Sequence, residues 1–155
     1  MRKAAVALAI MFAVITAGCG DSSKPSEMTV LELSKKALEV RLDRTLPLIS
    51  GEILKVDNLK KVDGILDKDG RYEADITFDL IHLKSDKDLD DMKNKYGVGS
   101  PSYMSVMSTS MWIALNFQTH YLAGDTMAKD VPSKVAFVKA EKGWRVDSVV
   151  LPRKF

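Results

Sequence analysis

The sequence predicts an α+β domain in which one long N-terminal helix packs on a curved antiparallel sheet of about five strands, with a short additional helix. Three observations predict this fold. Apolar residues recur at helical spacing after residue 29, they alternate over most of the chain between residues 53 and 151, and turn residues separate the alternating runs. A sheet with one apolar face needs a second layer to cover it, and the N-terminal helix can supply that layer.

A secretory signal precedes the domain. Arg2 and Lys3 form a basic head, residues 4–17 are uncharged and mostly apolar, and Ala17-Gly18-Cys19 closes the segment. The apolar run is shorter than the roughly 20 residues that a membrane-spanning helix needs. An ordinary cleaved signal would leave Cys19 as an odd free thiol in an oxidising compartment.

The junction resembles the lipobox of bacterial lipoproteins, although Thr16 stands where that family usually has leucine. In the family, the cysteine thiol receives a diacylglyceryl group, the chain is cut just before it, and the new amine is acylated. The resemblance implies lipidation of Cys19, a signal peptide over residues 1–18, a tether over residues 19–27 and a single domain over residues 28–155. It also implies a domain held in the periplasm. The outer membrane is slightly favoured over the inner one, because Gly20 rather than aspartate follows the cysteine.

Charge balance argues against a nucleic-acid partner. The 23 lysines and arginines include Arg2 and Lys3, so the mature chain carries as many cations as its 21 acidic side chains. A nucleic-acid binder would need a basic excess. Membrane attachment is therefore expected to come from the acyl chains, and two or three chains anchor a protein stably.

The first helix is predicted to begin with a capping box of Thr29 and Glu32, and to end by Leu46 because Pro47 follows. Its apolar face is predicted to contain Val30, Leu33, Ala37 and Val40, widened by Leu31, Leu38 and Leu42.

Residues 51–83 are predicted to form a long β-hairpin. Lys60 and Lys61 interrupt the first strand and indicate a bulge or bend. The turn is predicted at Asp67-Lys68-Asp69-Gly70. The return strand is expected to point one alternating set toward the core: Tyr72, Ala74, Ile76, Phe78 and Leu80.

A short helix is predicted over Ser85–Gly97, with Ser85 as N-cap, and residues 97–102 are predicted to be a loop. Residues 103–111 are ambiguous. Met104, Met107 and Met111 have helical spacing, and filling the core is the favoured role for them. The alternative is a flexible apolar contact surface, in which Met104, Met107 and Trp112 would belong to a partner surface.

Three further strands are predicted at 111–121, 134–140 and 144–151, with a loop over 124–132 and a tight turn at 141–143. Trp144 is expected to face inward and Trp112 to lie on the mostly polar side of its strand. The closing residues Lys142, Gly143, Trp144, Arg145 and Val146 resemble the last hairpin of small cystatin-like or NTF2-like proteins. That resemblance implies the same element order as the pattern analysis.

Catalytic chemistry is weakly indicated. NTF2-like enzymes use an aspartate and a histidine inside the cone of the sheet, but Asp79 and His82 are three residues apart and face opposite sides of a strand. A cross-strand pair of His82 with His120 stays open, and a structural or surface role is favoured for both histidines. No catalytic residue and no cofactor is therefore expected.

No metal site is expected either. Asp67, Asp69 and Glu73 lack the third oxygen ligand and the frame of a calcium loop, and no Cys/His cluster suits zinc. The acids near residue 67 and over residues 86–91 are more simply explained by turn and helix-start chemistry.

The sequence therefore predicts a non-enzymatic, membrane-anchored envelope lipoprotein whose domain binds an unidentified partner. The alternative is an NTF2-like enzyme or a small-ligand-binding protein with a pocket between helix and sheet. The interior of the sheet discriminates between them. Converging polar groups around a pocket favour the enzyme, and a filled apolar interior with an apolar surface patch favours the binding module.

Overall fold

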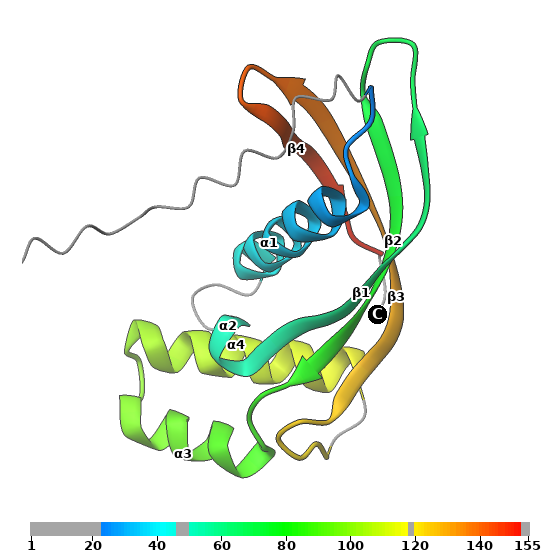
Figure 1. The fold of residues 1–155 in the computed structure, drawn as a ribbon. Coiled ribbons are helices and arrows are strands. Elements are labelled where there is room, and N and C mark those ends of the chain that lie inside the picture. Colours follow the sequence, from blue (N-terminus) through cyan, green and yellow to red (C-terminus); the bar gives the residue numbers. More distant parts are fainter. Residues whose placement is uncertain (1–22, 46–49, 118–119, 153–155) are drawn as a thin grey trace, which may run out of the picture.

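The fold is described by a computed structural model over residues 23–45, 50–117 and 120–152. The elements follow in the order α1 (Glu27–Thr45), α2 (Ser50–Ile53), β1 (Leu54–Leu66), β2 (Tyr72–His82), α3 (Asp86–Tyr96), α4 (Pro101–Asn116), β3 (Thr126–Ala140) and β4 (Gly143–Val150) (Figure 1). The signal segment and Cys19 lie outside the described residues, as do residues 46–49, 118–119 and 153–155.

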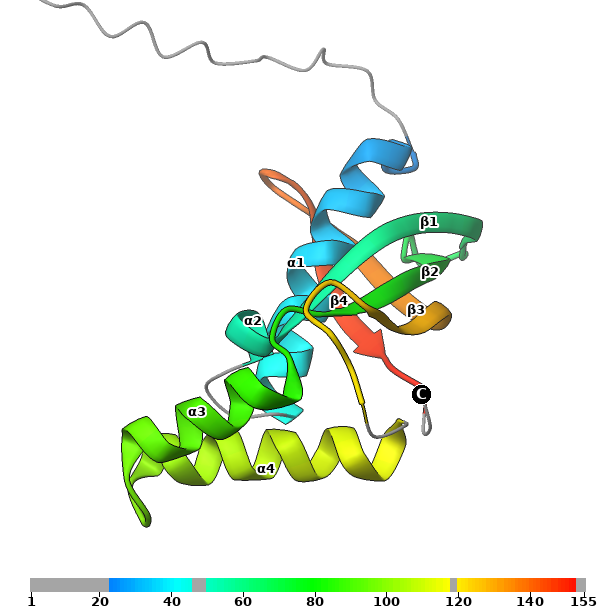
Figure 2. The same ribbon diagram turned by 90° about the horizontal axis from the view of Figure 1, so that it is seen from below.

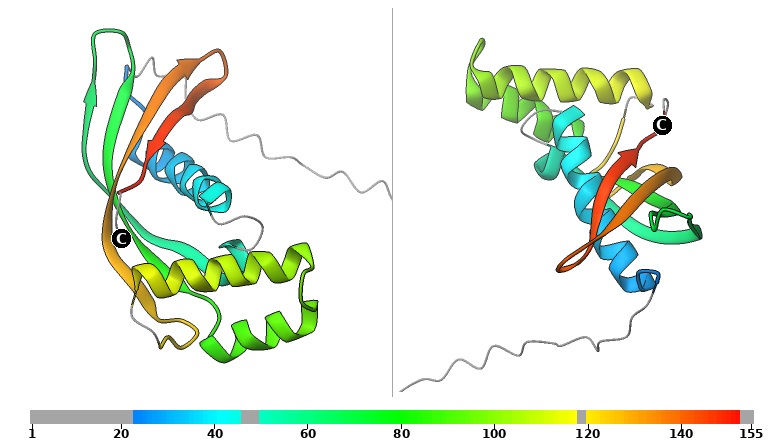
Figure 3. Two further views of the ribbon diagram at one scale, coloured as in Figure 1. Left: turned by 180° about the vertical axis from the view of Figure 1, so that it is seen from behind. Right: turned by 90° about the horizontal axis from the view of Figure 1, so that it is seen from above.

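The sheet is an antiparallel meander with the strand order β1-β2-β3-β4. Helix α1 crosses one face of this sheet, and the described helices all lie on that side of it (Figures 1 and 3). The predicted α+β class, with a helix packed on an antiparallel sheet, is confirmed. The sheet has four described strands, however, so the prediction of about five is wrong.

Apolar side chains fill the space between α1 and the first three strands of the sheet. The alternating residues predicted to face inward from β2 are all buried: Tyr72, Ala74, Ile76, Phe78 and Leu80. Their partners on β3 and α1 are buried as well: Val131, Val135, Phe137, Val30, Leu38 and Leu42. This two-layer packing forms the core of the domain.

Helix α1 begins earlier than predicted. The hydroxyl of Ser26 accepts a hydrogen bond from the amide of Thr29 at 3.2 Å, so Ser26 rather than Thr29 caps the first turn. The buried face is also rotated from the predicted one. It contains Val30, Ser34, Leu38 and Leu42, whereas Leu33 and Ala37 are half-buried and Val40 is exposed.

The predicted hairpin is confirmed, with β1 and β2 paired from Leu54–His82 to Leu66–Tyr72. The register of β1 shifts between Asp57 and Lys60 and again after Lys61, where the sequence indicates a bulge. In the turn, Asp67 accepts hydrogen bonds from the amides of Asp69 and Arg71 at 2.9 and 2.8 Å, and Gly70 adopts a φ of 77°. Asp67 therefore stabilises the turn through its side chain, as expected.

Asp79 holds two bulges together at the bend of the sheet. Its carboxylate accepts hydrogen bonds from the Asn58 side chain on β1 and from the Asp130 amide on β3, both at 2.8 Å. Asn58 and Asp130 both have positive φ, at 48° and 50°. One buried carboxylate thus accepts a side-chain hydrogen bond from β1 and a backbone hydrogen bond from β3, and these two bonds offset the cost of its burial.

The predicted short helix is confirmed as α3. Ser85 caps it in a reciprocal capping box with Asp88, Leu89 is buried, and Gly97 ends it with a φ of 70°. Within the described ranges, three further helices accompany α1, rather than the one short helix that the pattern predicts.

The strand predicted over residues 111–121 is wrong, because residues 101–116 form α4. Ser100 caps this helix by accepting a hydrogen bond from the Tyr103 amide at 3.1 Å, and Pro101 occupies the first turn. The hydroxyls of Ser105 and Ser110 donate to carbonyls four residues earlier, which satisfies them inside the helix. The predicted loop over 97–102 accordingly ends at Ser100.

Strand β3 is longer than predicted. It starts at Thr126, so most of the predicted loop over residues 124–132 is strand. The closing hairpin is confirmed, with Lys139 paired to Trp144 and Ala140 to Gly143. Trp144 faces inward as predicted, packs edge-on against Tyr72 with ring centroids 6.4 Å apart, and is half-buried.

Candidate partner-binding surface

Helix α4 exposes an apolar stripe to solvent. Met104, Met111 and Leu115 are 55%, 61% and 78% exposed, and Met107 beside them is half-buried. Their spacing of three, four and four residues places them on one face of the helix. We call Met104, Met107, Met111 and Leu115 the outer stripe of α4.

The opposite face of α4 anchors the helix to the domain. It contains the buried residues Ser105, Val106, Thr109 and Ile113. These side chains have 3.6-residue periodicity, so α4 has one buried face and one apolar exposed face. An exposed face of a helix is normally polar, and its apolar character here is the unusual feature.

Charge is absent from α4 and abundant beside it. None of the 16 residues of α4 is charged. The neighbouring helix α3 has Asp86 and Asp88 in its first turn and Lys93 and Lys95 in its last. A contiguous apolar stripe next to charged residues has the layout of a protein–protein contact, with an apolar centre and a polar rim.

The sequence-predicted partner residues are brought together only in part. Met104 and Met107 both belong to the outer stripe, so the favoured interpretation of the methionines as core filler is wrong for the exposed Met104 and Met111. Trp112 lies at the border of the stripe. It is half-buried, and its ring packs edge-on against Phe117 with centroids 5.4 Å apart. The sequence pattern places Met111 both among the helically spaced methionines and, with Leu115, in a strand in which apolar and polar residues alternate.

Helix α4, which contains the outer stripe, lies at the end of the domain opposite the first described residues. The first described residues, from Ser23 onward, lie at one end of the molecule, beside the tips of the two hairpins (Figure 1). Helices α3 and α4 lie at the opposite end, where α4 forms the outermost layer when the domain is viewed from below (Figure 2).

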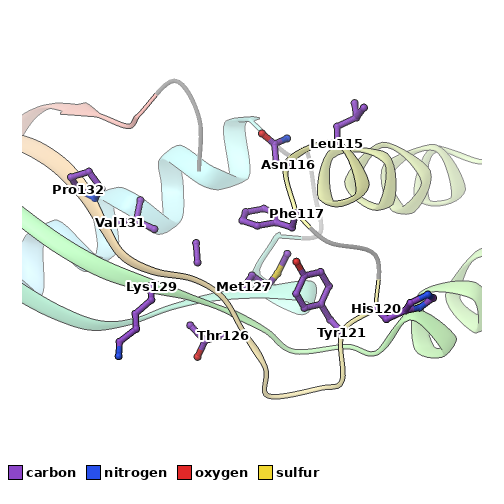
Figure 4. A pocket seen from close by; sticks show the side chains of 11 residues that line it. Leu115, Asn116, Phe117, His120, Tyr121, Thr126, Met127, Lys129, Val131 and Pro132 are labelled. Atoms are coloured by element: carbon purple, nitrogen blue, oxygen red, sulfur yellow. The ribbon is translucent and has the colours of Figure 1, made fainter.

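A cavity of about 740 Å³ lies between the C-terminal end of α4 and the first half of β3. Phe117, Tyr121 and Met127 gather in its centre, and His120 lies at its side (Figure 4). His120 is 95% exposed and its Nδ1 lies 3.3 Å from Asp86 Oδ2, outside the core. The cavity is open to solvent and has no acid–base pair among its described lining residues.

His82 is isolated from other hydrogen-bonding groups. The side chain is fully buried at the end of β2, its ring lies 5.7 Å from that of Tyr121, and neither ring nitrogen has a hydrogen-bond partner among the described residues. Burial lowers the pKa of His82 from its usual 6.5. The open possibility of a cross-strand pair with His120 is not realised, because the strand predicted to contain His120 is absent.

Asp79 likewise has a structural role, because it accepts hydrogen bonds from both neighbouring strands. The hydrogen bonds from the Asp130 amide and the Asn58 side chain lower the pKa of Asp79, because they stabilise the ionised form. Among the described residues, no group of three or more metal-binding side chains comes together. Within that same part of the chain, no helix has the length and hydropathy to cross a bilayer.

Comparisons of the chain with protein-family models, curated proteins and solved structures found no match. Function is therefore inferred from the sequence and from the geometry of the domain.

Proposed function

We propose that this chain is a membrane-anchored lipoprotein of the bacterial envelope, and that its domain binds a protein partner through the outer stripe of α4. The observation that carries the proposal is an exposed apolar stripe on a helix without any charged residue. Exposed apolar area of this kind raises the free energy of the isolated domain in water, and docking against a partner removes it.

The interior of the domain supports a binding role over an enzymatic one. Between α1 and strands β1, β2 and β3, buried apolar side chains from both layers form the core. An enzyme of the NTF2-like type would place an aspartate and a histidine inside the cone of the sheet. Here Asp79 accepts hydrogen bonds from the bulges of β1 and β3, and the ring nitrogens of the buried His82 have no hydrogen-bond partner among the described residues. By the criterion stated from the sequence, a filled interior with an apolar surface patch favours a binding module.

The anchor is proposed from the signal segment alone. Lipidation at Cys19 would leave seven residues between the anchor and Glu27, at most about 3.5 Å each. The domain would then stay close to the membrane while α4, at its far end, faces the periplasm. The name cystatin-like or NTF2-like is likewise a proposal, supported by the element order of a helix followed by a meander.

The proposal is tested in cells that produce the full chain. Met104→Ser, Met111→Ser and Leu115→Ser together should abolish capture of the partner in a cross-linked pull-down, because they remove the apolar contact area. The matched control is Val62→Ser with Ile65→Ser, which changes two residues that are 67% and 65% exposed on β1, in the hairpin at the other end of the molecule. The control should retain the partner.

Two results would contradict the proposal. If the stripe variant captures the same protein as the wild type, the outer stripe is not the docking surface. If Cys19→Ala remains in the membrane fraction without acyl label, the anchor does not depend on lipidation of that cysteine.

A further inference from the structure

A second surface of the domain forms a groove between α1 and the edge strand β4. Its volume is about 570 Å³, within the roughly 300–1,000 Å³ usual for small-molecule sites. From Leu33 to Arg44 the helix wall extends for about 16 Å at 1.5 Å per residue. The groove is distinct from the outer stripe of α4, which contributes no residue to it.

The floor of the groove is the part of the apolar face of α1 that the sheet leaves uncovered. The sequence pattern assigns Leu33, Ala37 and Val40 to the core, yet they are half-buried or exposed and line the groove. They face three half-buried apolar residues of β4: Trp144, Val146 and Val149. Apolar side chains from two elements thus line the same groove and are only partly covered.

The rim of the groove is cationic. Lys36, Arg41 and Arg44 line it from α1, and Arg145 lines it from β4. Asp147 is the one acidic residue among its described lining residues, and it already lies 3.3 Å from Arg71 Nη2. Cations thus outnumber carboxylates among the described residues that line the groove.

We propose that this groove binds a fatty acid, with the acyl chain on the apolar floor and the carboxylate at the cationic rim. The two halves of such a ligand match the two halves of the site: burial of methylene groups supplies affinity, and a carboxylate accepts charge-assisted hydrogen bonds from arginine or lysine. A purely apolar ligand would leave the cationic rim without a counter-charge, and a small anion would leave the apolar floor in contact with water.

The edge of β4 disfavours an extended acidic peptide as the occupant. The pairing of β3 with β4 shifts between Ala136 and Phe137, which leaves Asp147 as an extra residue on β4. A bulge at this position interrupts the regular spacing of backbone groups that strand addition needs. The groove is thus better suited to a ligand recognised by its chain and its charge.

The test uses membranes that contain the full chain and a photoactivatable long-chain fatty acid. Cross-linked peptides are mapped by mass spectrometry, so that labels within residues 33–44 and 144–149 are distinguished from acylation at the N-terminus. Lys36→Gln with Arg145→Gln should reduce groove labelling about tenfold, because two charge-assisted contacts are lost. Ala37→Trp should block labelling by filling the groove. Lys142→Gln, an exposed cation in the adjacent turn, is the matched control and should label like the wild type.

Four outcomes would overturn the proposal. The first is that the Lys36→Gln, Arg145→Gln variant is labelled as strongly as the wild type. The second is that the neutral methyl ester of the probe labels the groove as strongly as the free acid. The third and fourth are that only a diacyl phospholipid form of the probe, or only a photoactivatable acidic peptide, labels the groove. Partner capture through α4 should be unchanged in every groove variant, so failure here is distinguishable from failure of the proposed docking surface.

Discussion

At the scale of single residues, two buried ionisable groups stabilise the fold in one protonation state each. Asp79 is held ionised by the Asp130 amide and the Asn58 side chain, and its folded pKa lies below the usual 3.8. His82 is held neutral by burial, and its folded pKa lies below the usual 6.5. In both cases the unfolded chain binds protons more readily than the folded chain as the pH falls.

Acid should therefore destabilise the domain in two steps. The contribution of His82 is complete above pH 6.5 and is lost as the pH falls toward its lower folded pKa, and that of Asp79 is lost similarly below pH 3.8. Thermal melts of a soluble form beginning at Gly20 should show a falling melting temperature between pH 7 and pH 5. All described contacts lie after Gly20, so this form retains them.

The variant His82→Phe distinguishes the loss of stability caused by protonation of His82 from the loss caused by protonation of Asp79. It should flatten the pH dependence between pH 7 and pH 5, and at pH 7 it should be neutral or stabilising by about 1 kcal/mol, because the unpaired ring nitrogens are removed. Asp79→Asn should leave the first step intact. A His82→Phe protein with the same slope as the wild type between pH 7 and pH 5 would show that His82 is not the titrating group.

At the scale of elements, substitution of two half-buried tryptophans distinguishes an effect on folding stability from an effect on partner binding. Trp144 of β4 packs against Tyr72, and Trp112 of α4 packs against Phe117. Either substitution by alanine should cost about 2 kcal/mol of unfolding free energy, below the 3–5 kcal/mol typical of fully buried aromatic residues, because both rings are partly in water.

Only Trp112→Ala should also weaken partner capture, since Trp112 borders the outer stripe. By contrast, Met111→Ser should weaken capture with little change in the melt, because Met111 is 61% exposed. Denaturant titrations and the pull-down measure the two effects separately. A Trp144→Ala domain as stable as the wild type would mean that the inward assignment of β4 is wrong.

The same elements show what the sequence could and could not predict. The hairpin of β1 and β2 was predictable because alternation, an Asp-Gly turn and a lysine-marked bulge agree in one segment. Helix α4 was not, because apolar residues at positions 111, 113, 115 and 117 alternate as in a strand. The Ser100-Pro101 pair, an N-cap followed by proline in the first turn, was the available signal.

The candidate surfaces were predictable only in part, for a physical reason. Met104 and Met107 are recognisable as helically spaced methionines, but their exposure depends on which side of α4 the rest of the chain covers. Leu33, Ala37 and Val40 have the spacing of a core face, yet the sheet covers the adjacent face of α1, which contains Ser34 and Leu38. Periodicity identifies apolar faces, and only tertiary packing decides which of them stay open.

At the scale of the whole molecule, the two ends of the domain are formed by different elements. The first described residues lie beside the hairpin tips, α1 crosses the sheet in the middle, and α3 and α4 form the far end (Figures 1 and 2). In the proposed lipoprotein, the tether attaches near the hairpin tips. The stripe that binds the partner is then held away from the bilayer, within reach of proteins in the periplasm.

The most direct test of this account is site-specific photo-cross-linking in living cells. A photoactivatable residue is placed in the full chain at position 111, on the outer stripe, and in a second version at position 65, which is comparably exposed at the opposite end of the domain. The account predicts a discrete cross-linked protein adduct from position 111 and none of the same mass from position 65. The same adduct from both positions, or an adduct from position 65 alone, would contradict the claim that α4 is the surface that docks the partner.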